Sequence, residues 1–98
     1  MKITIISILW LISLNLNLLA NDFAIAYEAF QKKDFIKAEE YYKKACDSGD
    51  NTTCAILGNL YYEGKSFKQN FVKASELFKK SCVGGYFKAC YSLANMYE

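Results

Sequence analysis

Residues 35–62 read FIKAEEYYKKACDSGDNTTCAILGNLYY, and residues 71–98 read FVKASELFKKSCVGGYFKACYSLANMYE. The two stretches align without gaps and are identical at 12 of 28 positions, at a spacing of 36 residues. A fixed period of this length is typical of arrays in which each repeat is one supersecondary unit. We therefore expect a chain built from repeated units that stack on their neighbours.

Each unit predicts two helices joined by a tight turn. The first helix has apolar or small residues three and four positions apart, which places them on one inward face. These residues are Phe35, Ala38, Tyr41, Tyr42 and Ala45 in the first unit, and Phe71, Ala74, Leu77, Phe78 and Ser81 in the second. Gly49 or Gly85 then supplies the positive φ that ends a helix, and Asp50 or Asn51 can cap the next one. We predict the second helices over 54–62 and 90–98.

A further amphipathic segment precedes these units at residues 23–34, with Ala26 and Phe30 inward and a polar stop at 32–34. The prediction is therefore an all-α solenoid of five helices, or about two and a half hairpins, because stacked pairs can share one apolar core. The aromatic residues at helical spacing are expected in that core, with an aromatic binding stripe as the alternative. They are Tyr41, Tyr42, Tyr61, Phe78 and Tyr97.

The composition excludes several kinds of chemistry. The 98 residues include no His and no Pro, and all 12 basic residues are Lys, against 10 acidic residues. Without His there is no imidazole base or His metal ligand, and without Arg there is no guanidinium clamp for phosphate or carboxylate. The lysines are interspersed with acidic residues and form no basic block along the sequence, so we expect no nucleic-acid partner. No cofactor and no metal are expected either.

The N-terminus resembles a secretion signal. Lys2 precedes an apolar run through Leu14, and a more polar stretch ends at Ala20, after which we predict cleavage. An uncleaved anchor is the alternative, but polar residues interrupt the run, and a span needs about 20 predominantly apolar residues. We expect residues 1–20 to be a signal peptide and 21–98 the repeat domain, secreted or periplasmic in a Gram-negative bacterium, with no stable membrane span.

The four cysteines are expected to form disulfides in that oxidising compartment. Four cysteines permit three pairings, which the sequence alone does not distinguish. In each unit, however, one Cys closes a helix and another, separated from it by seven residues, lies in the opening turn of the next helix, close enough for a bridge. We predict Cys46–Cys54 and Cys82–Cys90. A zinc site would favour closer C-x(2–4)-C pairs, and a redox-active pair would favour C-x-x-C.

The sequence resembles a known family. LGNLYYEG, residues 57–64, is similar to the LGxxYxxG signature of Sel1-like repeats, a subclass of the tetratricopeptide superfamily, and LANMYE, residues 93–98, is similar with Ala94 in place of Gly. Two Cys per repeat in an exported chain resemble the cysteine-rich Sel1-like proteins of the Helicobacter and Campylobacter group. The sequence reaches Glu98 before the Gly that would end the third signature helix, so we expect a truncated product or an end that docks on another surface.

The resemblance implies a scaffold that holds a protein or peptide in a concave groove. By analogy with tetratricopeptide repeats, the first helix of each hairpin lines that groove, where hairpins are counted from the segment at residues 23–34. The groove helices are then this segment and the helices predicted over 54–62 and 90–98. The expected groove positions are Tyr27, Ala55, Asn59, Tyr62, Tyr91, Asn95 and Glu98. Asn59 and Asn95 occupy equivalent places, and their amides can both donate to and accept from a peptide backbone. A solvent-facing Asn with no ligand is the alternative for each.

The same resemblance implies a second function, because penicillin binding and slow β-lactamase activity have been assigned to cysteine-rich members. A β-lactam or a peptidoglycan-like molecule is therefore a further ligand class. The chain has no Ser-x-x-Lys motif of the kind that serine β-lactamases use. We name no catalytic residue and expect a binding protein, with β-lactam hydrolysis as the alternative.

Overall fold

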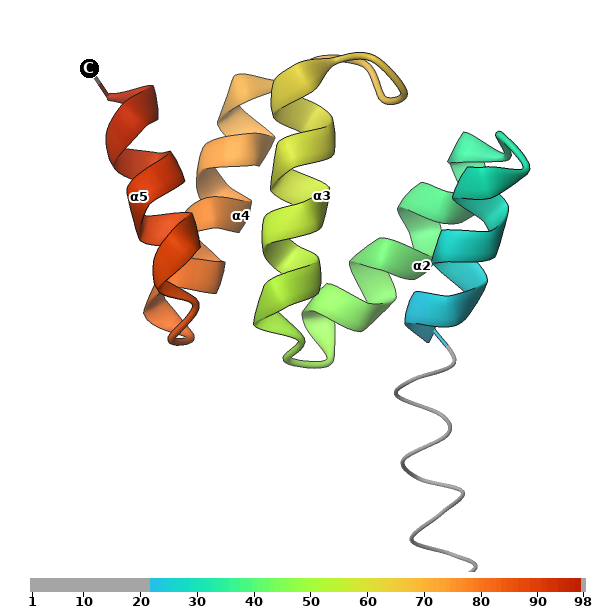
Figure 1. The fold of residues 1–98 in the computed structure, drawn as a ribbon, viewed down its shortest axis with the longest axis horizontal. Helices are drawn as coiled ribbons and strands as arrows, with labels where there is room; N and C mark the ends of the chain where they lie inside the picture. Colours follow the sequence, from blue (N-terminus) through green and yellow to red (C-terminus); the bar gives the residue numbers. More distant parts are fainter. Residues whose placement is uncertain (1–21, 98) are drawn as a thin grey trace, which may run out of the picture.

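The computed structural model describes residues 22–97 and forms an all-α solenoid. The predicted signal peptide and its cleavage site lie outside the described residues. The five helices cover residues 22–31, α2 Phe35–Asp47, α3 Asn51–Glu63, α4 Phe71–Val83 and α5 Phe87–Met96. They run alternately up and down, with α3, α4 and α5 side by side (Figure 1). No helix within residues 22–97 has both the length and the apolar character needed to cross a bilayer.

Two helices begin earlier than the sequence analysis predicts. α3 begins at Asn51 and α5 at Phe87, each three residues before the predicted Cys. Asp50 is the N-cap of α3, since its carboxylate accepts from the Thr53 backbone N–H at 3.1 Å and from the Thr53 hydroxyl at 2.6 Å. Asn51, the other predicted cap, is already helical. α5 ends at Met96, with Tyr97 as its C-cap.

The glycine turns agree with the prediction. Gly49 and Gly85 have φ of 104° and 108°, values that side chains with a Cβ rarely adopt. The loop at residues 32–34 makes a similar reversal without glycine, because Lys33 has a φ of 63°. That is a left-handed conformation, which favours Gly or Asn over Lys.

The core runs through the helices as one cluster of small and aromatic side chains. Its buried members include Ala26, Ala38, Tyr42, Leu57, Tyr61, Phe67, Ala74, Phe78 and Ala89. α3 and α4 approach closely at Gly58, where an added Cβ would lie 2.9 Å from the Phe78 ring. The Gly of the signature sequence therefore makes room for an aromatic ring of the next helix.

Two predicted core residues are exposed. Phe71 begins α4 and packs edge-on against Tyr62, with ring centroids 5.5 Å apart, outside the core. Tyr97 is also exposed, although its equivalent Tyr61 is buried. Tyr61 is covered by Phe67 from the 64–70 loop, at a centroid distance of 5.6 Å. No described residue takes that place beside Tyr97.

Disulfides join each first helix to the helix that follows it. Cys46 pairs with Cys54 and Cys82 with Cys90, the pairs that the spacing predicts, with Cα–Cα distances of 4.7 and 4.8 Å. Both distances are in the range that a disulfide spans. Cys46 and Cys54 are completely buried, whereas Cys82 and Cys90 are partly exposed.

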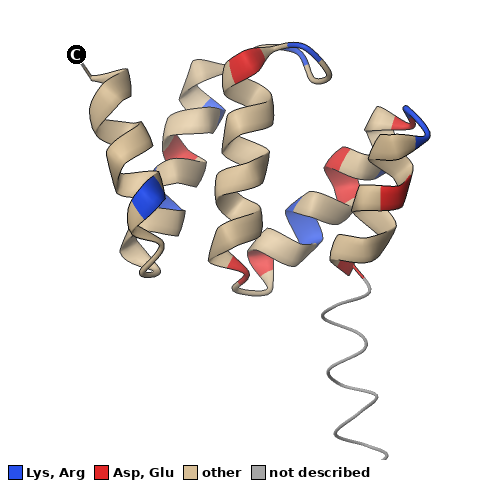
Figure 2. Ribbon diagram, in the orientation of Figure 1, with Lys and Arg blue, Asp and Glu red and all other residues tan. Residues whose placement is uncertain are grey.

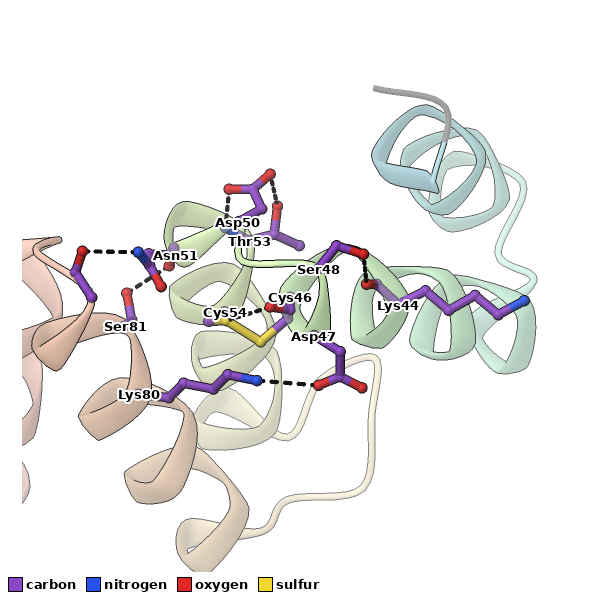
Figure 3. The surroundings of a disulfide bond; sticks show 11 residues. Lys44, Cys46, Asp47, Ser48, Asp50, Asn51, Thr53, Cys54, Lys80 and Ser81 are labelled. Atoms are coloured by element: carbon purple, nitrogen blue, oxygen red, sulfur yellow. Dashed lines mark hydrogen bonds and ion pairs between the residues drawn. A yellow bond between two sulfur atoms is a disulfide. The ribbon is translucent and has the colours of Figure 1, made fainter. Parts of the chain in front are cut away.

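Polar contacts fix the turn after α2 against the end of α4 (Figure 3). The Ser81 hydroxyl donates to the Asn51 carbonyl at 2.6 Å, and the Asn51 amide donates to the Gly84 carbonyl at 2.9 Å. Lys80 forms an ion pair with Asp47 at 3.2 Å. These contacts connect residues about one repeat apart, so they hold the end of α4 against the turn that joins α2 to α3.

Candidate partner-binding groove

A small hollow lies between α3 and α5, with α4 behind it. Its volume is about 150 Å³, and its lining residues are Asn59, Tyr62, Phe78, Ser92, Asn95 and Met96. Three predicted groove residues, Asn59, Tyr62 and Asn95, thus come together from two successive repeats. We call this hollow and the exposed faces of α3 and α5 beside it the groove.

The groove is built of uncharged groups. None of the six lining residues carries a charge, and Glu63 and Lys88 are the only charged residues within α3 and α5. The charges of the solenoid are concentrated on α2 and α4 instead (Figure 2). The groove therefore offers amide hydrogen bonds and apolar contact rather than a strong local field.

Local contacts hold the walls of the groove in place. Tyr62 is positioned by the Phe71 ring and by Gln69, whose side-chain amide donates to the Tyr62 carbonyl at 2.9 Å. The Ser92 hydroxyl donates to the Lys88 carbonyl at 3.2 Å, so its proton is already used within α5. Asn59 and Asn95 are exposed, and both can offer an amide to a ligand.

The other predicted groove positions do not line this hollow. Tyr27 lies on the 22–31 helix, half exposed, with its ring 6.3 Å from that of Phe23. Tyr91 is exposed on α5 but is not a lining residue. Ala55 is buried, and Glu98 is outside the described residues.

The structure adds three lining residues that the sequence analysis did not assign to the groove. Ser92 lies one helical turn before Asn95, which could have indicated it. Met96 lies one residue after Asn95 and is partly buried. Phe78 was expected in the core, where it is almost completely buried, and it also closes the base of the hollow.

A second, larger hollow of about 300 Å³ opens between α2 and α4, with α3 at its base. The Tyr61 hydroxyl donates to the Glu39 carboxylate there, and the Lys73 ammonium lies 5.1 Å from the Tyr61 ring centroid. Burial, together with the hydrogen bond to Glu39, raises the pKa of Tyr61. The phenol therefore stays protonated at neutral pH and serves as a donor between two helices.

Two kinds of reactive group, a free thiol and a cluster of metal-binding side chains, are absent from the described residues. All four cysteines are in disulfides. No cluster of three or more Cys, Asp or Glu side chains suited to a metal ion occurs in residues 22–97. What the groove presents is a surface with hydrogen-bonding and apolar groups.

Comparison with known proteins connects part of the chain to one relative. No protein-family model matches the chain. The chain is 40% identical over 42 residues to the protein named "Putative beta-lactamase HcpC" of Helicobacter pylori strain 26695, and 43% identical over 37 residues to its namesake in strain J99. These matches cover 43% and 38% of the chain but only 14% and 13% of the relatives. Because HcpC is a cysteine-rich Sel1-like repeat protein, the similarity supports that family.

Proposed function

We propose that the chain is a helical-repeat scaffold, exported from the cytoplasm, that binds a protein or peptide in the groove between α3 and α5. The observation that carries this proposal is the meeting of Asn59, Tyr62 and Asn95 around one uncharged hollow, although Asn59 and Asn95 are 36 residues apart. The partial similarity to HcpC supports a Sel1-like scaffold. The two disulfides are consistent with an oxidising compartment.

The groove is suited to an extended peptide segment without strong charge. Asn59 and Asn95 can each donate to and accept from a peptide backbone, because a primary amide has both kinds of group. The hollow between them accommodates about one aliphatic side chain, and Met96 and Phe78 supply its apolar walls. Backbone hydrogen bonds would orient the ligand, and the seated side chain would select it.

The test is the selection of a peptide from a phage-displayed random library on the oxidised protein, followed by titration of the selected peptide. Asn59→Ala/Asn95→Ala is expected to weaken its binding at least about tenfold, since two amide contacts are lost. Thr52→Ala/Gln31→Ala is the matched control, because both of these polar residues are exposed and lie outside the groove. All three proteins should unfold at similar temperatures.

Two results would contradict the proposal. One is a library that yields no binding peptide, and the other is a selected peptide that binds equally to wild type and to the Asn59→Ala/Asn95→Ala variant. Beyond the family resemblance, β-lactam hydrolysis is supported only by the name of the relatives. Turnover of a chromogenic β-lactam is measured on the same preparation, and sustained turnover would favour that alternative.

A further inference from the structure

Two loops lie along the same edge of the solenoid. The loop at 32–34 leads into α2, and the loop at 64–70 joins α3 to α4 (Figure 1). Because successive helices alternate in direction, both loops and the first residues of α2 and α4 are at one edge. We call residues 32–37 and 64–72 the loop edge. The turns at 48–50 and 84–86 form the opposite, or turn, edge.

The loop edge gathers lysines. It contains Lys32, Lys33, Lys37, Lys65 and Lys68, all exposed. Asp34 is the one acidic residue within it, and the exposed Glu63 adjoins it at the end of α3. Lys32 pairs with Glu28 at 2.8 Å, but the other four lysines form no ion pair with a described residue. Figure 2 shows basic residues in both loops. The lysines come from two segments about 30 residues apart, which is why the sequence has no basic block.

The backbone at Lys33 adds to this pattern. Its φ of 63° is a conformation in which Gly or Asn would be less strained. The chain nevertheless carries a cation at this position. Asp34, the neighbouring acid, accepts from the Lys37 backbone N–H at 3.3 Å as the N-cap of α2, so its carboxylate is partly committed to the helix.

Apolar side chains project into solvent beside these lysines. Ile36 is 85% exposed, Val72 68% and Phe71 53%. Ile36 and Val72 are equivalent residues of successive repeats, one at the start of α2 and one at the start of α4. The transfer of exposed aliphatic groups out of water is favourable. Together with the neighbouring lysines, these groups favour a partner that is both anionic and apolar.

We propose that the loop edge binds the surface of a bilayer that contains anionic phospholipids. The lysines would lie at the level of the lipid phosphates, and Ile36, Val72 and Phe71 would enter the boundary between headgroups and acyl chains. A nucleic acid or a soluble polyanion would satisfy the lysines but would leave the aliphatic side chains in water. This surface is separate from the groove lining, apart from Phe71 and Gln69, which support Tyr62.

The experiment measures partition onto sedimenting vesicles of phosphatidylglycerol and phosphatidylcholine, with phosphatidylcholine alone as the reference. The protein is the oxidised form recovered from an exporting host, with its N-terminus determined by mass spectrometry. We expect binding to the anionic vesicles that weakens between about 0.1 M and about 0.5 M salt, because screening shortens the range of the attraction. A retained apolar N-terminus would add equally to both vesicle types, so the difference between them is the quantity of interest.

Paired variants distinguish binding by the loop edge from an effect of the net charge of the protein. Lys65→Glu/Lys68→Glu should lower the partition coefficient at least about 25-fold, because each lysine near an anionic surface contributes about fivefold to this coefficient. Lys79→Glu/Lys88→Glu makes the same change in net charge near the turn edge and should change it less than about threefold, as a long-range effect. Ile36→Ser/Val72→Ser should weaken binding as well, whereas Val83→Ser/Phe87→Ser, also exposed, should not.

Three results would overturn the proposal. One is equal partition onto anionic and neutral vesicles. Another is an equal loss for the two lysine variants, which would indicate a net-charge effect. The third is binding to heparin or an oligonucleotide that matches the binding to vesicles and is unaffected by Ile36→Ser/Val72→Ser, which would indicate a soluble polyanion as the partner.

Discussion

The two disulfides close loops of equal length in different surroundings, so their separate removal gives a quantitative test. In each bridge the sequence separation is 8. Each disulfide lowers the conformational entropy of the unfolded chain, and for a loop of this size this raises the free energy of the unfolded state by about 2.5 kcal/mol. Entropy alone therefore predicts equal destabilisation by Cys46→Ala/Cys54→Ala and by Cys82→Ala/Cys90→Ala.

Burial makes the two variants unequal. Cys46 and Cys54 are each 0% exposed, and removal of their sulfur atoms leaves space inside the core. Such a cavity adds about 1 kcal/mol for a change of this size. Cys82 and Cys90 are partly exposed, so solvent can fill part of the space. We expect a loss of about 3–4 kcal/mol for the first variant and about 2–2.5 kcal/mol for the second.

Thermal unfolding followed by circular dichroism at 222 nm is the assay, with mass spectrometry to establish which bridges are present. For a domain of this size, 1 kcal/mol corresponds to about 4–8 °C, so each variant should melt at least about 8 °C lower than wild type. Unchanged melting temperatures would refute the entropic argument. A larger loss on removing Cys82–Cys90 than Cys46–Cys54 would refute the argument from burial.

Two further predictions concern buried contacts. Burial and the hydrogen bond to Glu39 raise the pKa of Tyr61, and burial raises the pKa of Tyr42, so the folded state keeps protons that the unfolded chain loses at high pH. The contribution of each phenol to the free energy of unfolding is present below about pH 10 and falls by about 1.4 kcal/mol per pH unit above it. Urea unfolding at a series of alkaline pH values should show this slope. Tyr61→Phe should make the slope shallower. Gly58→Ala should destabilise by about 1–2 kcal/mol, although helix propensity alone favours Ala, because the new Cβ would overlap the Phe78 ring. Ala94→Gly, at the equivalent exposed position of α5, should cost about 0.5–1 kcal/mol from propensity alone, and a stabilising Gly58→Ala in the same urea assay would contradict the packing argument.

Much of the fold was predictable because it depends on local patterns. The 36-residue repeat, the inward positions such as Ala38 and Phe78, and the glycine turns are all readable along the chain. Helix starts were less predictable, since Asp50 caps α3 directly whereas Tyr86 precedes α5 without a side-chain cap. Phe71 was assigned to the core by its spacing, but the partner that it contacts is Tyr62, at the end of another helix.

The candidate groove was predictable in part. Family resemblance singled out Asn59, Asn95 and Tyr62, and these three line one hollow. The same resemblance placed Tyr27 and Tyr91 in the concave groove, but neither lines the hollow. The difference arises because a lining position depends on how successive repeats pack against one another, and the hydrogen bonds of Asn51 with Ser81 and Gly84 are part of that packing.

The sequence determines what depends on neighbours close along the chain. Helices with one apolar face, the glycine turns between them and disulfides between cysteines eight residues apart all follow from local spacing, because each involves at most a few turns of helix. The tertiary structure decides what depends on the stacking of repeats. The Tyr61–Glu39 hydrogen bond, the hollow beneath Asn59 and Asn95, and the gathering of lysines at the loop edge each join segments about 20 to 36 residues apart, and only the packing of the helices brings those segments together.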